Sequence, residues 1–166
     1  LGDVDLVINN AGVANTGSVL DAEGLDSLRW MLETNVFGLL NVSRGFAPVL
    51  ARQGGGAVVN VLSVASWVSN PVLANYGVTK AAAWSATNAL RDALRAQGTQ
   101  VLGVHVGLID TDLTRGFDAP KLTTETVVER VFAALEAGDS EVLVDELTRA
   151  VKRGLSAEPG IYTLAR

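Results

Sequence analysis

The sequence contains no cysteine, and this absence removes several kinds of chemistry at once. A chain without cysteine forms no disulfide, carries no thiolate nucleophile and builds no cysteine-based metal site. The chain also has a single histidine, which excludes histidine-rich metal sites. The lack of cysteine is compatible with a cytoplasmic protein, which is the location we expect.

Long apolar runs and clusters of basic residues are also missing. No apolar stretch approaches the roughly 20 residues of a membrane span, so no membrane partner is expected. The net charge is −5, with acids and bases interspersed, which argues against binding nucleic acid or an anionic membrane surface. The 166 residues are 48% hydrophobic and 19% charged, which is typical of one soluble globular domain spanning 1–166.

Strand-like and helix-like segments alternate along the chain. Apolar or β-branched runs predict strands, and longer periodic or alanine-rich segments predict helices. The expected strands are 3–8, 57–62, 99–106 and 141–144, and the expected helices are 21–52, 74–97, 123–137 and 145–155. Pro48 is expected to bend or fray the first helix. This order predicts an α/β fold with a parallel sheet covered by helices on both faces.

The most informative residues are Tyr76 and Lys80, with Ser63 thirteen residues before the tyrosine. Two side chains four residues apart on a helix lie on the same face. A nearby ammonium favours the phenolate and so draws the tyrosine pKa down from about 10 toward neutral pH. A serine hydroxyl could hold a substrate oxygen against the phenol. The trio suits proton transfer to and from that oxygen, but the hydride must come from a cofactor.

Four further motifs occur with this trio in a fixed order. They are Asn9-Asn10-Ala11-Gly12 after the first expected strand, Asn35 within Thr34-Asn35-Val36-Phe37-Gly38, Ser63 at the end of Val58-Val59-Asn60-Val61-Leu62-Ser63, and Gly107-Leu108-Ile109-Asp110-Thr111 after the third expected strand. In this order and approximate spacing, from residue 3 to about residue 150, the chain resembles the short-chain dehydrogenase/reductase family. The resemblance implies a Rossmann fold and an NAD(P)-dependent oxidoreductase that interconverts a carbonyl and an alcohol.

The resemblance also assigns roles to individual residues. Tyr76 would be the general acid and base, and Lys80 would lower the tyrosine pKa and bind the nicotinamide ribose. Ser63 would orient the substrate oxygen, and Asn35 would hold a water that relays protons from the lysine. The expected cofactor-binding residues are Asn9, Ala11, Gly12, Tyr76, Lys80, Ile109 and Thr111. Several of these assignments have a purely structural alternative. Asn9 could bond the backbone of neighbouring strands, and Asn35 could simply interrupt a helix. Ser63 could be an ordinary turn serine, and Thr111 could cap a helix.

The start of the family pattern is not found in these 166 residues. A dinucleotide-binding sheet opens with a strand and a glycine-rich turn that cradles the pyrophosphate. Gly54-Gly55-Gly56 is no substitute, because it precedes a strand and does not open a helix. We therefore expect a partial, three-layer Rossmann fold whose first three strands are missing and whose 3–8 strand lies at an edge. NAD cannot be distinguished from NADP, because the selecting residues belong to the missing part.

The loop at 107–122 is expected to cover the substrate. Apolar contacts in this loop would come from Leu108, Leu113, Phe117 and Pro120, and charge from Asp110, Asp112 and Arg115. The segment after Ser63 is expected to line the same pocket with Trp67, Val68 and Val72. The mixture suggests a modest, largely apolar carbonyl or alcohol. Val106 stands where the family usually has proline, which should leave the following turn less rigid. His105 has no motif partner and is interpreted as a packed histidine, and Trp30, Trp67 and Trp84 are interpreted as core, pocket-wall or interface residues.

Two other functions are compatible with the sequence. A truncated chain could be a catalytically silent scaffold that only dimerises, since the family resemblance implies a homo-oligomer formed through helices 21–52 and 74–97. Small side chains such as Ala82 and Ala86 permit close helix approach there, although they could equally pack on the sheet. Epimerases and dehydratases share the Tyr-x-x-x-Lys pattern, but Asn9-Asn10-Ala11-Gly12 and the Ser63 spacing favour a reductase.

Overall fold

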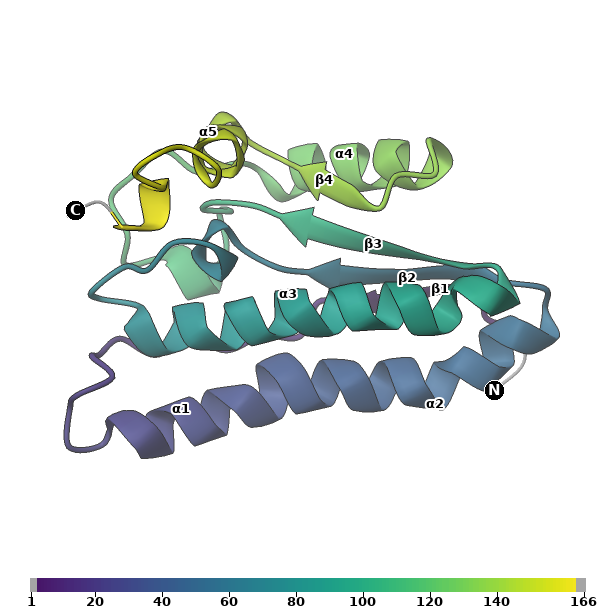
Figure 1. Ribbon diagram of the computed structural model, residues 1–166, viewed down its shortest axis with the longest axis horizontal. Coiled ribbons are helices and arrows are strands. Elements are labelled where there is room, and N and C mark those ends of the chain that lie inside the picture. The colour runs from purple at the N-terminus through teal and green to yellow at the C-terminus, as the bar shows by residue number, and fades with distance from the viewer. Residues whose placement is uncertain (1–2, 164–166) are drawn as a thin grey trace.

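The computed structural model describes residues 3–163, which form a four-stranded parallel sheet between two layers of helices (Figure 1). The strands are β1 (Leu6–Asn9), β2 (Gly56–Val61), β3 (Thr99–His105) and β4 (Glu141–Leu143), and they lie in that spatial order. All three strand pairs are parallel. The expected α/β fold with a parallel sheet is confirmed. No helix within 3–163 is long and apolar enough to cross a membrane.

The helices are distributed over both faces of the sheet. They are α1 (Gly24–Leu32), α2 (Leu39–Arg52), α3 (Ala74–Leu94), α4 (Thr124–Glu136) and α5 (Glu146–Gly154). In Figure 1, α1, α2 and α3 lie below the sheet and α4 and α5 lie above it. The third and fourth expected helices match α4 and α5, and side-chain caps from Thr123 and Asp145 mark their starts.

Alternation along the strands explains how both faces are covered. Successive side chains of a strand point to opposite faces. Val58 therefore packs with Leu50 of α2 on one face, whereas Val59 packs with Val131 of α4 on the other. Because both faces are buried, β2 reads as a continuous apolar run and not as an alternating one.

The expected helix at 21–52 is interrupted by a structure that the sequence did not predict. It begins at Gly24 and not at Asp21, and Glu33–Gly38 form a π-helical segment between α1 and α2. Asn35 and Val36 are buried within this segment. Pro48 lies inside α2 without ending it. A π-helical turn adds one residue to the helix and often occurs at a functional site.

Glycine occupies two turns that lead into the sheet, one after α3 and one after α2. Gly98 ends the 3₁₀ turn Arg95–Gln97 in the left-handed region, with φ of 74°. Gly56 opens β2 at φ of 124°, where a Cβ would lie 2.5 Å from the Asp5 carbonyl oxygen. Both turns lie at the end of the sheet opposite to the candidate site.

Candidate active site

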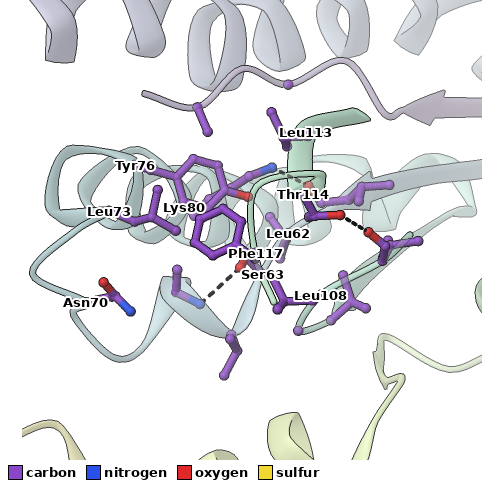
Figure 2. Close-up of a pocket in the computed structure, with 18 of the residues that line it drawn as sticks. Leu62, Ser63, Asn70, Leu73, Tyr76, Lys80, Leu108, Leu113, Thr114 and Phe117 are labelled. Carbon is purple, nitrogen blue, oxygen red and sulfur yellow. Dashed lines mark hydrogen bonds between the residues drawn. The ribbon is translucent and has the colours of Figure 1, made fainter. Parts of the chain in front are cut away.

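A cavity of about 670 Å³ lies at the carboxyl ends of β1, β2 and β3. Ligands of open parallel sheets characteristically bind at this edge. Tyr76 and Lys80 reach the cavity from α3, Ser63 from the segment after β2, and Leu113 and Phe117 from the loop after β3 (Figure 2). These five residues, separated by up to 54 positions in the sequence, therefore meet around one cavity.

Ser63 is held at the end of β2 by its own backbone. It has extended φ and ψ of −160° and 159°, and its hydroxyl oxygen accepts a hydrogen bond of 3.1 Å from the Ala65 amide. This bond caps the 3₁₀ turn Val64–Ser66. The same hydroxyl lies close enough to the Tyr76 side chain to lower the pKa of its phenol.

Tyr76 sits in the first turn of α3, where its ring is partly buried. Burial raises the pKa of the Tyr76 phenol, and the hydrogen bond with Ser63 lowers it by a smaller amount. The sequence predicted that Lys80 would dominate and lower this pKa, which differs from what the structure shows. The Lys80 ammonium lies 5.7 Å from the centre of the Tyr76 ring and is directed to another acceptor. The phenol therefore keeps its proton at neutral pH.

Lys80 is one turn after Tyr76 and is buried. Its ammonium donates a hydrogen bond of 2.8 Å to the Val61 carbonyl oxygen, at the last residue of β2. Burial lowers the pKa of Lys80 from 10.5 to about 8, because the low-dielectric surroundings disfavour the charged form. The remaining N–H groups of the ammonium are available to a ligand in the cavity, which Lys80 lines.

Asn35 fixes the loop after β1 to α3. Its amide oxygen accepts a hydrogen bond of 2.8 Å from the Val13 amide. Its amide nitrogen donates hydrogen bonds of 2.9 Å to the Val13 carbonyl oxygen and to the Thr79 hydroxyl oxygen. Asn35 is not among the residues that line the cavity, so its expected water-holding role stays a prediction. The contact with Thr79, which lies between Tyr76 and Lys80, has no signal in the sequence.

The expected cofactor-binding residues divide into two groups. Gly12, Tyr76, Lys80, Ile109 and Thr111 line the cavity. Asn9 and Ala11 do not, because the Asn9 amide turns away and donates to the hydroxyl oxygen of Ser43 and to the amide oxygen of Asn60, at 3.1 and 2.8 Å.

Gly12 leaves open the space beside the ammonium. A Cβ at this position would lie 3.6 Å from the Asn35 amide oxygen and 3.7 Å from the Lys80 ammonium. The Gly12 backbone thus permits close approach by a ligand ring that carries hydroxyl groups. Thr111 is both a lining residue and the cap of the 3₁₀ turn Asp112–Thr114.

The walls of the cavity also differ in part from expectation. Leu108, Leu113, Phe117, Val68 and Asp112 line it, whereas Trp67, Val72, Pro120, Asp110 and Arg115 do not. Trp67 is buried and stacks on His105, with ring centres 3.9 Å apart. Asn10, which the family resemblance also marks as cofactor-lining, lines the cavity, and so do four residues that the sequence did not indicate: Asn70, Leu73, Leu147 and Val151. Leu147 and Val151 come from α5. Because this helix is rich in charged residues, its sequence did not indicate that it would line a cavity.

Val106 occupies the turn after β3 without disrupting it. Its side chain is buried, and its carbonyl oxygen accepts a hydrogen bond of 2.9 Å from the Val64 amide. The Gly107 amide donates to an Asp145 carboxylate oxygen at 2.6 Å. These contacts hold the turn from both sides, in the place where the family usually has proline.

Comparisons with known proteins agree with this geometry. The sequence profile described as short chain dehydrogenase matches residues 1–121. An uncharacterized oxidoreductase of Staphylococcus epidermidis is 31% identical over 150 residues, which cover 89% of this chain and 64% of that protein. The probable oxidoreductase EphD of Mycobacterium tuberculosis is 34% identical, over 93% of this chain and 27% of its own length. The chain thus spans less than two thirds of either relative.

Solved structures give the same picture of the fold. A short chain dehydrogenase from Burkholderia cenocepacia, crystallised with NADP, superposes with a TM-score of 0.89 at 38% identity, over 95% of this chain and 66% of that one. A short chain dehydrogenase/reductase from Burkholderia phymatum, crystallised with NAD, superposes with a TM-score of 0.76 at 24% identity, over 92% of this chain and 65% of that one. At the lower identity the likeness concerns the fold alone.

Proposed function

Because this chain belongs to the short-chain dehydrogenase/reductase family, we propose that it interconverts a carbonyl and an alcohol with NAD or NADP as cofactor. The observation that carries the proposal is the convergence of Ser63, Tyr76 and Lys80 on one cavity. Each of the three presents a polar group that can act on a single substrate oxygen. An epimerase or dehydratase finds no additional group in its favour among the lining residues.

The described residues fit the nicotinamide end of such a cofactor. Gly12 leaves room for a ribose or a flat ring, and Lys80 has N–H groups free to bond ribose hydroxyls. Ile109 and Thr111, which also line the cavity, would contact the carboxamide. When bound, the nicotinamide would supply a hydride to the substrate carbon, or accept one from it in the reverse direction.

The residues of the chain would handle the proton. In reduction, the Tyr76 phenol would give its proton to the substrate oxygen as the carbonyl becomes an alcohol. Its raised pKa keeps the proton available at neutral pH. The Ser63 hydroxyl would hold the same oxygen in place, and the nearby Lys80 ammonium would stabilise the phenolate that remains. In oxidation, the same groups would act in reverse.

The lining residues indicate a neutral, largely apolar substrate. Leu73, Leu113 and Phe117 contribute apolar surface around the reacting groups. Within 3–163, Lys80 is the single cationic side chain that lines the cavity, and the charge of Asp112 is paired with Arg115. A substrate carboxylate would therefore compete for the lysine that the proton transfer requires. We propose an uncharged aldehyde, ketone or alcohol.

Titration of reduced cofactors against the purified chain tests the proposal. The 166 residues provide nicotinamide and ribose contacts but no glycine-rich pyrophosphate turn. We therefore expect NADH, NADPH and reduced nicotinamide mononucleotide to bind with similar, weak affinity, followed by fluorescence. A neutral ketone should then be reduced with loss of absorbance at the nicotinamide band. No binding of any of the three up to millimolar concentration would contradict the proposal and favour the silent scaffold.

We also propose that two copies of the chain associate through the helices of one face. Trp30 of α1, Phe37 of the π-helical segment and Val78 of α3 are large apolar side chains that remain about half exposed. Covering such residues is a common reason for a helix pair to self-associate.

The oligomeric state is tested by a charge placed on these helices. The double variant Trp30→Glu, Phe37→Glu should shift the mass measured by light scattering from a multimer to a monomer. The matched control is Phe132→Glu, which charges an equally exposed aromatic residue on α4, and it should retain the wild-type mass. A wild-type chain that is already monomeric would refute the proposal.

A further inference from the structure

His105 is fully buried at the last position of β3, directly behind the Ser63 backbone. Its Nδ1 atom lies 3.3 Å from the Ser63 carbonyl oxygen. Its Nε2 atom lies 3.3 Å from a carboxylate oxygen of Glu141, the first residue of β4. Within 3–163, Nε2 forms no well-aligned hydrogen bond, so this contact is electrostatic at its present geometry. The only histidine of the chain thus stands between a catalytic-site backbone and a carboxylate.

The surroundings of the ring carry charge on one side only. The Glu141 carboxylate lies 2.8 Å from the ammonium of Lys152 on α5. That ammonium also lies 4.8 Å from the centre of the Trp67 ring, which stacks on His105 with an angle of 19° between the rings. Asp145, at the start of α5, is engaged with the Gly107 and Thr148 amides. Glu141 and Lys152 are therefore the charged groups set behind the imidazole.

Glu141 remains ionised in this position. Its partial burial acts to raise its pKa, but the contacts with His105 and with the Lys152 ammonium outweigh that effect and bring the pKa to about 2. The imidazole therefore faces a full negative charge at neutral pH.

A neutral imidazole cannot serve both of its neighbours. It carries one N–H, so either Nδ1 or Nε2 must point a lone pair at an oxygen atom. The imidazolium carries two N–H groups and can donate to the Ser63 carbonyl and to the Glu141 carboxylate together. The proton on the ring therefore determines how firmly the Ser63 carbonyl is held.

That carbonyl belongs to the same residue as the hydroxyl that lies beside Tyr76. It also accepts a hydrogen bond of 3.0 Å from the Ser66 amide, while the Ser63 hydroxyl accepts one from the Ala65 amide. Because the Cα of Ser63 carries both groups, a displacement of the Ser63 backbone would move the hydroxyl as well. Nothing in Figure 2 or in the cavity lining places His105 itself against the substrate.

We propose that His105 is a positioning residue of the active site, whose ring holds the Ser63 carbonyl in a manner set by its protonation and by Glu141. The inference rests on the proposed function, because the Ser63 hydroxyl has a task only if proton transfer occurs at this site. His105 acts through Ser63 and touches neither substrate nor cofactor.

Nuclear magnetic resonance tests the proposal without requiring turnover. Because the chain has one histidine, its Cε1–H signal reports the protonation of His105 alone. The Val64 amide nitrogen belongs to the same peptide bond as the Ser63 carbonyl and reports that carbonyl's hydrogen bonding. We expect the Val64 amide signal to follow the His105 signal as pH is varied from about 5 to 9, with the same midpoint. The Val58 amide, in the middle of β2, should not follow it.

Two variants sharpen the test. Glu141→Gln should move the midpoints of both signals together to lower pH, because the carboxylate that favours the imidazolium is gone. Glu146→Gln is the matched control, since it makes the same chemical change on an exposed carboxylate paired with Arg149 and Arg153. It should move neither midpoint. In His105→Gln, if it folds, the pH response of the Val64 amide should disappear.

A Val64 signal that stays still while His105 titrates, or that follows a different midpoint, would overturn the proposal, and so would a His105 signal that does not titrate. With a turnover assay in hand, His105→Gln should lower kcat several-fold with little change in the KM for the cofactor. Absence of turnover in the wild-type chain would count against the proposed function, whereas the resonance result decides the role of His105 independently.

Discussion

Replacing Tyr76 with phenylalanine should reduce carbonyl reduction by about 10²- to 10⁴-fold, the range contributed by a positioned general acid. The variant removes one oxygen atom and keeps the ring that packs beside Lys80. The substrate oxygen then has no effective proton donor, because the Ser63 hydroxyl is a much weaker acid than a phenol. Steady-state kcat with a neutral ketone and saturating cofactor is the measurement.

The control for this variant is available in the chain itself. Tyr162 is the only other tyrosine, is 59% exposed and lies outside the cavity lining. Tyr162→Phe should leave kcat and the melting temperature unchanged. Tyr76→Phe should also keep the melting temperature within a few degrees, which separates a chemical effect from unfolding. Retention of more than about a tenth of the wild-type kcat in Tyr76→Phe would remove the tyrosine from the mechanism.

Replacing Lys80 with methionine should make the ligand-free protein more stable while abolishing its activity. Burial lowers the pKa of Lys80 from 10.5 to about 8, so the folded protein at neutral pH carries a charge that the surroundings disfavour. The difference corresponds to about 3 kcal/mol of lost stability. Methionine has a similar shape and no charge, but it leaves the Val61 carbonyl without the lysine donor, at a cost of about 1 kcal/mol. We expect a net gain of about 2 kcal/mol in the free energy of unfolding at pH 7.

The pH dependence gives this prediction a second check. Between pH 8 and 10.5 the unfolded chain binds the lysine proton more tightly than the folded chain, so wild-type stability rises with pH in that window. The stability advantage of Lys80→Met is therefore complete below pH 8 and should vanish as pH approaches 10.5. Urea unfolding at pH 7 and at pH 10 measures both values. Lys121→Met, on the loop that precedes α4, is the control and should show no such pH-dependent difference.

A destabilised Lys80→Met variant, or a gap that stays constant with pH, would show that the buried ammonium is well compensated in the folded protein. The prediction concerns ligand-free protein, because a bound cofactor would add contacts to the ammonium.

The sequence was a good guide where spacing and strand ends determine position. Tyr76 and Lys80 are four residues apart, so any helix through them brings both side chains to one face, and α3 does so. Ser63 follows a β-branched run and Gly107 follows another, and parallel strands bring their carboxyl ends to one edge. The presence of four strands, and their alternation with helices along the chain, followed from the apolar runs and helical periods.

Contacts that depend on distant partners could not be read in the same way. Asn35 bonds Val13, 22 positions away, and nothing in either residue's neighbours indicates the pairing. Trp67 was expected in the pocket wall because it follows Ser63 by four residues. It packs inward because its ring stacks on the ring of His105, 38 positions later in the sequence, and because Val151 of α5 packs against it. The lowered pKa of Lys80 depends on burial by several elements together, which no local pattern encodes.

The π-helical segment Glu33–Gly38 has a consequence for how this chain tolerates insertions and deletions. A regular α-helix advances about 100° per residue, so removing one residue from this segment to make α1 and α2 a continuous helix would rotate one against the other by about that angle. Met31 and Leu50 would then no longer face the interior together, and Asn35 would leave its partners. A length change of a single residue, harmless in most surface loops, would here misalign a whole helix with the sheet.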